Sequence, residues 1–185
     1  YKRFAGQNFT AVHDNFSNIK NIAKNLGIEF TSQDNNLAIA LGGFTEGVTP
    51  KSLCDAYSAF ANSGNFSKSS FITKITKNEK VVYKQKPTTK KVMKDSTAFL
   101  ITNILEDSTK TGTAKRLADL PYQVASKTGT VGYNEAGNSD VWSVGYTLTH
   151  TVSVWMGYDI NTNFNGDSYP KIIWKKIMDA IVREE

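Results

Sequence analysis

The sequence predicts an α/β fold of the α+β type, in which an antiparallel sheet is flanked by helices. Apolar residues at helical spacing occupy both ends and the middle of the chain, and three β-rich runs follow one another in the last third. The last two runs are joined only by Leu148, Thr149 and His150. A link this short permits an antiparallel pair, whereas a parallel pair needs a long crossover.

Composition and charge exclude several classes of protein. The chain has 185 residues, of which 39% are hydrophobic, and this is enough for a packed core. Its 22 basic and 17 acidic residues give a net charge of only +5, so we expect no nucleic-acid partner. No apolar run approaches about 18 residues, so any membrane anchor is expected outside this chain. Because the first residue is Tyr1 and not Met, we expect a processed protein or a piece of one.

Two helices are predicted in the first third. Residues 17–26 have helical spacing and end at Gly27, and one face is expected to be buried, formed by Ile19, Ile22, Ala23 and Leu26. The apolar run 37–41 leads into a flexible glycine loop. A second helix is predicted to begin with Thr49 as its N-cap and Pro50 as its first residue, and to end at Gly64.

The middle of the chain is predicted to form a hairpin and a third helix. Residues 71–76 and 81–83 are the expected strands of the hairpin. Lysines are dense between residues 74 and 94 and aromatic residues are sparse there, which is more typical of a solvated basic face than of a binding patch. Asp95 is expected to cap the third helix, whose inner side would carry Ala98, Ile101, Ile104 and Leu105.

The last third changes to strands. The three β-rich runs are residues 122–126, 141–146 and 151–158, and the third alternates apolar with other residues. A closing helix is predicted from Pro170, with its inward side formed by Ile173, Ile177, Ala180 and Ile181 and its outward side by Lys171, Lys175, Lys176 and Asp179.

The residues Lys127-Thr128-Gly129-Thr130 are the strongest candidate for chemistry. They follow a β-rich run, and an ammonium, two hydroxyls and a glycine at a strand end suit the binding of an anionic carbonyl substrate. Thr128 and Thr130 would face the same side of a strand. The same four letters occur at residues 110–113, but those follow a helix and are expected in a loop or cap. Only the second copy has the setting of an edge strand.

Several residues outside this motif are candidates for a functional or a packing role. Tyr133 and Asn134, in the glycine- and asparagine-rich loop predicted at 132–139, are candidates for lining a substrate cleft. Trp142 and Trp155 are expected to pack in the sheet. Cys54 is expected to be a buried thiol, and as the only cysteine it excludes an internal disulfide and a zinc cluster. His13 and His150 lack a ligand pattern, so we expect no metal and no cofactor.

Six segments in order resemble the transpeptidase domain of class A penicillin-binding proteins, the bifunctional enzymes of bacterial cell-wall synthesis. They are residues 41–43, 47–50, 56–64, 126–130, 140–147 and 154–158, together with the Lys110-Thr111-Gly112 loop. The resemblance implies a fold like that of penicillin-binding proteins and serine β-lactamases. It also implies that residues 1–185 are the C-terminal portion of one such domain.

The family uses the motifs S-x-x-K, S-x-N and K-T-G, and only the third is convincingly present in this sequence. The resemblance places the other two ahead of the matched region. We therefore expect the serine nucleophile in an upstream segment of the same protein, and we expect this chain alone to be catalytically incomplete.

The resemblance implies acyl transfer on the D-Ala-D-Ala end of a peptidoglycan stem peptide, with β-lactams acting as substrate mimics. Lys127 would supply positive potential and orient the serine motif, and the Thr128 and Thr130 hydroxyls would bind the substrate carboxylate. The Thr130 N–H would be an oxyanion donor, and Gly129 would keep the strand edge open. The implied location is the extracytoplasmic face of the bacterial cell membrane.

Alternatives from other classes stay open at this point. A D,D-carboxypeptidase or a serine β-lactamase also uses K-T-G, although the strands that carry Trp142 and Trp155 favour the class A synthases. A non-catalytic β-lactam sensor, or a cell-wall binding module that uses the lysine-rich hairpin, is a further alternative.

Overall fold

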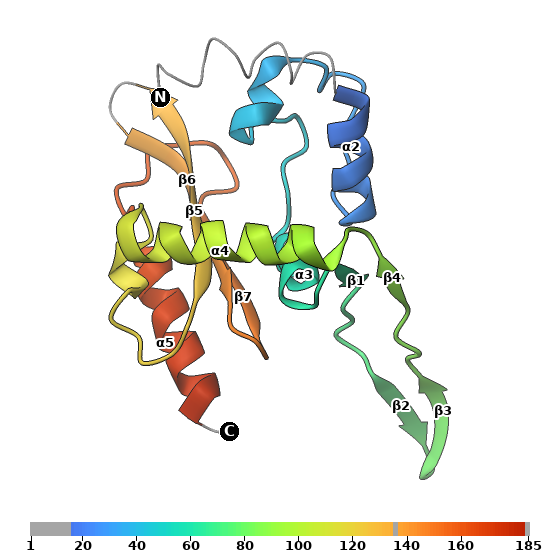
Figure 1. The fold of residues 1–185 in the computed structure, drawn as a ribbon. Helices are drawn as coiled ribbons and strands as arrows, with labels where there is room; N and C mark the ends of the chain where they lie inside the picture. Colours follow the sequence, from blue (N-terminus) through green and yellow to red (C-terminus); the bar gives the residue numbers. More distant parts are fainter. Residues whose placement is uncertain (1–15, 135–136, 184–185) are drawn as a thin grey trace.

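The computed structural model describes residues 16–134 and 137–183 (Figure 1). The helices are α2 (Phe16–Asn25), α3 (Pro50–Ala61), α4 (Asp95–Thr111) and α5 (Tyr169–Arg183), with short 3-10 helices η1 (Leu37–Leu41) and η2 (Lys115–Leu117). The strands are β1 (Asn65–Ser67), β2 (Lys74–Lys77), β3 (Lys80–Lys84), β4 (Thr89–Lys91), β5 (Ala125–Asn134), β6 (Gly137–Tyr146) and β7 (Thr151–Gly157).

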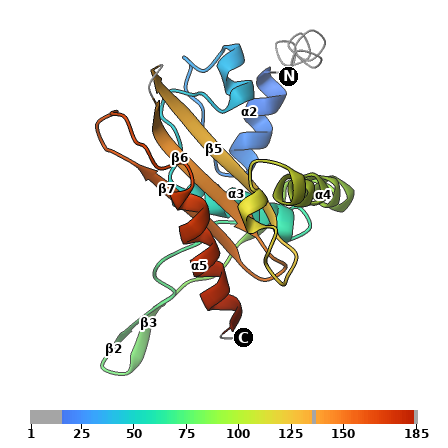
Figure 2. The same ribbon diagram turned by 90° about the vertical axis from the view of Figure 1, so that its left-hand side faces the viewer.

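The centre of the fold is an antiparallel sheet of three strands in the order β5-β6-β7. Helix α5 packs on one face of this sheet, α3 packs on β6 and β7, and α4 contacts β5 with its axis across the strand direction (Figures 1 and 2). Strand β1 pairs with β4, and β2 pairs with β3. The predicted class, an antiparallel sheet flanked by helices, is therefore confirmed.

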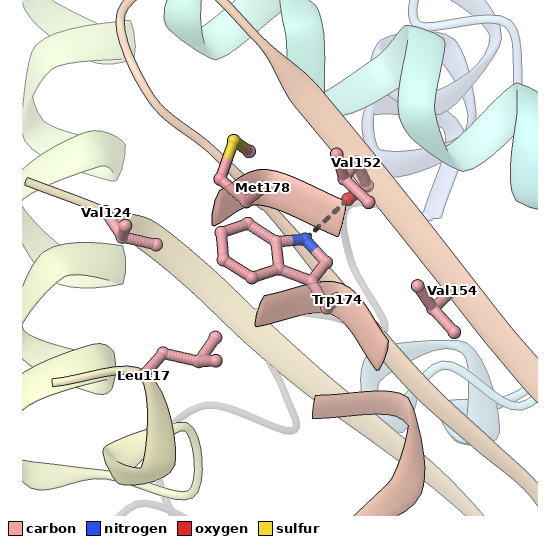
Figure 3. Packing of buried hydrophobic residues seen from close by; sticks show 6 residues of the cluster. All are labelled: Leu117, Val124, Val152, Val154, Trp174 and Met178. Atoms are coloured by element: carbon pink, nitrogen blue, oxygen red, sulfur yellow. Dashed lines mark hydrogen bonds between the residues drawn. The ribbon is translucent and has the colours of Figure 1, made fainter. Parts of the chain in front are cut away.

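The main hydrophobic core lies between α5 and the sheet (Figure 3). Trp174 and Met178 of α5 are fully buried, and the Trp174 Nε1–H donates to the Val152 carbonyl over 2.9 Å. They pack with Leu117, Val124 and Val154. The bulkiest side chain of the core is thus fixed in orientation by a hydrogen bond to the strand that it covers.

The inward side of the last helix differs from the prediction. Ile173 and Ile177 are 37% and 39% exposed, while Trp174 and Met178 are completely buried. Apolar residues occupy two neighbouring stripes of α5, so periodicity alone was compatible with either side. Burial of the indole, which removes the larger apolar area from water, decided the orientation.

Two other predicted faces are partly wrong. Ala98 and Leu105 of α4 are buried, but Ile104 is 67% exposed. In α2 no residue is buried and Ile22 is 56% exposed; only Leu26, just beyond the helix, is buried.

Among the predicted helix starts and strands, some are confirmed and one is wrong. Thr49 caps α3 as expected, with its side chain accepting from the Ser52 N–H over 3.1 Å. Asp95 is instead the first residue of α4, and its carboxylate pairs with Lys91. The lysine-rich hairpin is confirmed as β2 and β3.

The strand predicted at 122–126 begins at Ala125 and continues to Asn134. The loop predicted at 132–139 is therefore wrong. Most of it belongs to β5 and β6, because their pairing continues past Gly132 through irregularities in register.

Asp34 is a buried acid that the sequence did not single out. Its carboxylate accepts hydrogen bonds from the backbone N–H and hydroxyl of Thr31 and of Thr45, over 2.7–2.9 Å. Burial opposes its ionisation, but the four hydrogen bonds outweigh burial and lower the pKa of Asp34 to about 2. The ionised carboxylate thus holds together the two ends of the segment 31–45.

This geometry predicts a pH dependence of stability. Because the folded-state pKa of Asp34 lies below its unfolded value, its contribution is present above about pH 4 and is lost as the pH falls toward 2. We expect the melting temperature of the parent to fall more steeply between pH 4.5 and 2.5 than that of Asp34→Asn, which has no charge to lose. Parallel curves for the two proteins would contradict this.

Candidate active site on strand β5

Strand β5 is an edge strand of the central sheet and carries all of the candidate residues from 127 to 134. Within the described residues, no strand pairs with its outer edge. Cross-strand partners share a face, so Thr128 lies on the face of Ser143 and Gly129 on the opposite face with Trp142. The residues of the motif therefore alternate between two faces, beside an open edge.

Helix α4 and the turn after it hold the first of these faces. The Thr109 hydroxyl of α4 is 2.8 Å from the buried Ser126 hydroxyl. The Thr113 hydroxyl is 2.6 Å from the Thr128 hydroxyl. Two consecutive same-face residues of β5 are thus tied to α4 and its C-terminal turn.

The two K-T-G-T copies, which sequence context had separated, meet at this contact. Lys110 and Thr111 end α4, and Gly112 caps it with an N–H that donates to the Ser108 carbonyl, so the predicted cap is confirmed. Thr113, however, contacts Thr128 of strand β5. No sequence signal predicted this role, because it depends on how α4 is placed beside β5.

Lys127 is exposed and lies on the other face of β5, opposite Val144. Its Nζ donates a hydrogen bond to the carbonyl of Thr128 over 2.8 Å. That carbonyl is accessible to a side chain at the strand edge. Backbone groups of a strand alternate between its two edges, so the N–H of Thr130 points to the same open edge as the backbone groups of Thr128.

Gly129 makes room for the tryptophan pair. A Cβ at this position would lie 3.2 Å from the Cβ of Trp142 on the neighbouring strand. The rings of Trp142 and Trp155 are 6.2 Å apart, and the Trp155 Nε1–H donates to the Asp140 carboxylate over 2.8 Å. The tryptophans therefore pack on the sheet, as predicted.

The remaining candidates are placed less closely around the motif. Tyr133 is 38% exposed and lies in β5, not in a loop. Asn134 ends β5, and its side chain lies outside the described residues, as does His13. Cys54 is half-buried and donates to the Thr151 carbonyl. Burial raises the pKa of the Cys54 thiol, so it is protonated and unsuited to act as a nucleophile.

The letters of the two serine motifs also occur elsewhere in this chain. S-x-x-K is found at Ser17–Lys20 and Ser168–Lys171, and S-x-N at Ser63–Asn65. Lys20 donates hydrogen bonds to the Thr31 carbonyl and to the side-chain oxygen of Asn35. In the described structure no hydrogen bond joins Ser17, Ser63 or Ser168 to Lys127.

Neither a metal centre nor a membrane span is found among residues 16–134 and 137–183. No cluster of three or more acidic, histidine or cysteine side chains there could hold a metal ion. The described helices are also too short or too polar to cross a bilayer.

A family model for the transpeptidase domain of penicillin-binding proteins matches residues 12–179. The chain belongs to this family. The match spans the open strand β5, the helix α4 that holds it and the core helix α5. The motif Lys127-Thr128-Gly129-Thr130 therefore lies within the family's domain.

Relatives and solved structures agree with this membership. Penicillin-binding protein 1A/1B of Bacillus subtilis is 37% identical over 152 residues, which are 75% of this chain and 16% of that protein. Penicillin-binding protein 1F of the same organism is 35% identical, over 78% of this chain and 21% of its own length. The chain thus spans about a fifth of the length of these relatives.

The structure of PonA1 from Mycobacterium tuberculosis in complex with penicillin V is similar, with a TM-score of 0.67 and 25% identity. The alignment covers 80% of this chain and 41% of the PonA1 chain. The fold of PBPA from the same organism is also similar, with a TM-score of 0.70 and 15% identity over 88% of this chain and 45% of that one.

Proposed function

We propose that this chain provides the substrate-binding strand of a serine D,D-transpeptidase that cross-links peptidoglycan stem peptides and is acylated by β-lactams. The observation that carries the proposal is the edge strand β5. It presents Lys127, Thr128 and Thr130 beside an edge with which no described strand pairs, and α4 and the turn after it hold it through Ser126 and Thr128. Membership of the penicillin-binding transpeptidase family supports the same reaction.

The serine belongs to a segment of the same protein outside these residues. Its Oγ attacks the carbonyl of the penultimate D-Ala, the C–N bond to the terminal D-Ala breaks, and the leaving amine takes a proton. An amine on a neighbouring peptidoglycan strand then attacks the serine ester, and the serine recovers its proton. The chain's own residues bind and orient the peptide for both steps.

Each residue of the motif has a distinct task in this proposal. The Lys127 ammonium supplies positive potential at the open edge and orients the serine motif. The hydroxyls of Thr128 and Thr130 lie on one face, where they bind the terminal carboxylate of the peptide. The Thr130 N–H donates to the oxyanion that forms on the attacked carbonyl. Gly129 leaves the other face to Trp142.

The proposed substrate sets the place of action. Peptidoglycan is assembled outside the cytoplasm, so we place the domain on the extracytoplasmic face of the bacterial membrane, with its anchor in another part of the protein.

A split active site predicts that the isolated 185-residue chain forms no covalent adduct with penicillin, while the complete protein does. Intact-mass spectrometry with a fluorescent penicillin measures this directly. Ser17→Ala and Ser168→Ala in the complete protein serve as controls and are expected to leave the adduct unchanged. A stable adduct on the isolated chain would contradict the split site.

The contact between Thr113 and Thr128 predicts a smaller effect. In the complete protein, Thr113→Val should lower the rate of penicillin acylation about three- to tenfold, because the loss of one hydrogen bond of about 1 kcal/mol loosens the substrate strand. Thr111→Val is the matched control, since its hydroxyl bonds only the Asp107 carbonyl of its own helix. Equal rates for the two variants would show that Thr113 does not position the strand.

A further inference from the structure

The lysine-rich hairpin is a projecting arm that carries the chain's excess of positive charge. Between residues 68 and 94 there are nine lysines and one glutamate, a net charge of +8, against +5 for the whole chain. The rest of the protein is therefore net negative. Both views show β2 and β3 extending away from the sheet and its helices (Figures 1 and 2).

The charges of the arm are available to a partner. Every residue from 68 to 84 is exposed. Lys91 pairs with Asp95 at the base of the arm, but none of the five lysines from 74 to 86 has an acidic partner among the described residues. At the base, β1 pairs with β4 and the Asp55 carboxylate accepts from the Ser69 N–H over 3.2 Å. The arm is therefore anchored to the body and open beyond it.

The register of the hairpin places lysines on both of its faces. Lys74 pairs with Lys84, and Lys77 pairs with Lys80. Residues 74 and 77 are an odd number apart in β2, so the two pairs face opposite sides of that strand, separated by about 10 Å along the arm. The register shift between Ile75 and Thr76 leaves Val82 of β3 as an extra residue between the two pairs. A flat anionic surface can contact only one of these lysine pairs at a time, whereas a flexible polymer can wrap around the arm and contact both.

The apolar side chains of the arm argue against a lipid surface. Ile75 pairs with Tyr83, on the same face as the tip lysines Lys77 and Lys80. Val81 pairs with Thr76, on the face of Lys74. Segments that lie in a bilayer interface separate an apolar face from a charged one, whereas each face of the paired residues of this hairpin carries both an apolar side chain and a lysine pair. The exposed Phe71, Ile72 and Val82 lie outside these pairs.

We propose that the arm binds a flexible, base-free phosphodiester polymer. All nine cationic residues from 68 to 94 are lysines and none is an arginine. Lysine binds phosphate as a point charge, whereas the arginine fork binds carboxylate and phosphate groups in a fixed, bidentate geometry. An arm with lysines alone therefore suits a polymer whose separated phosphates can adjust their positions to the charges. Binding of the polymer by the arm is independent of acyl transfer on β5. It would keep the domain bound to an anionic polymer during acyl transfer.

The test uses the 185-residue chain and a fluorescent poly(glycerol phosphate) of about twenty units, with binding followed by polarisation. The arm variant combines Lys74→Gln, Lys77→Gln, Lys80→Gln and Lys84→Gln. The matched control variant combines Lys24→Gln, Lys110→Gln, Lys115→Gln and Lys176→Gln, which removes the same charge from exposed positions elsewhere. Circular dichroism checks that both variants are folded.

The arm variant is expected to bind at least tenfold more weakly than the parent in 50 mM salt, and the control variant within about threefold. The slope of log K against log salt should become shallower by about 3 in the arm variant, since each neutralised phosphate contributes about 0.7 on a flexible strand. Equal losses in the two variants, or no binding by the parent, would overturn the proposal.

Two further probes separate this ligand from other polyanions. Oligodeoxythymidylate of equal phosphate number should bind no more tightly than the base-free polymer, because stacking on aromatic residues is not needed. Vesicles containing 30% anionic phospholipid should bind the parent and the arm variant alike. Tighter binding of the oligonucleotide, or arm-dependent binding to vesicles alone, would overturn the proposal.

Discussion

Lys127→Ala is expected to lower the second-order rate constant for penicillin acylation of the complete protein by about a hundredfold or more. The reason is electrostatic, since the ammonium stands at the open edge of β5 where negative charge develops in the transition state. Its hydrogen bond in the described structure is to the neighbouring Thr128 carbonyl, and the side chain is exposed. The substitution should therefore leave the fold intact and act on the reaction.

Lys110→Ala provides the matched control, because Lys110 has the same sequence context but ends helix α4. We expect its acylation rate to stay within about twofold of the parent. Stopped-flow measurements with a fluorescent penicillin give both rate constants, and circular dichroism checks folding. Similar losses of acylation rate in the two variants would show that Lys127 does not act in the active site.

Thr130 is expected to contribute to the acylation rate in two separable ways, through its hydroxyl and through its backbone N–H. Thr130→Val deletes the hydroxyl and keeps the backbone N–H, so acylation should weaken without vanishing. Thr130→Pro also deletes the N–H and should cost roughly 3 kcal/mol more in transition-state stabilisation, a further hundredfold in rate. Because this N–H faces the open edge of β5, its loss breaks no bond of the β5–β6 ladder.

The comparison is made by acylation kinetics on proteins whose thermal melts match that of the parent. An ester in place of the amide of residue 130 is a second way to remove the N–H while keeping the threonine side chain. If either N–H-deficient protein acylates as fast as Thr130→Val, Thr130 donates no hydrogen bond to the oxyanion, and the motif would retain carboxylate binding alone.

Local chemistry made several elements predictable from the sequence. The Thr49 cap, the helix α3, the hairpin of β2 and β3 and the antiparallel pairing of β6 with β7 follow from residues close together in the chain. The motif at 127–130 was assigned to an edge strand, and the structure places it in one. These features depend on capping, periodicity and link length, which neighbouring residues set.

Packing decided what periodicity left ambiguous. The side of α5 that faces the sheet is set by burial of Trp174 and its bond to the Val152 carbonyl, and this makes Ile173 and Ile177 outward-facing. The Asp34 cluster likewise joins Thr31 to Thr45 across a loop. Both depend on which distant groups meet, and residue type and spacing do not specify this.

The sequence by itself determined the class of fold and the family resemblance, and it singled out residues 127–130 as the candidate motif, because each of these depends on residues that are close together in the chain. Only the tertiary structure decided that Thr113 of the first K-T-G-T copy contacts Thr128 of the second, and that Ser126 is buried against Thr109. The physical reason is that a hydrogen bond between two hydroxyls needs their oxygen atoms to lie within about 3 Å of each other. The core that Leu105 of α4 shares with Ala125 of β5 brings the two elements together and so meets this requirement.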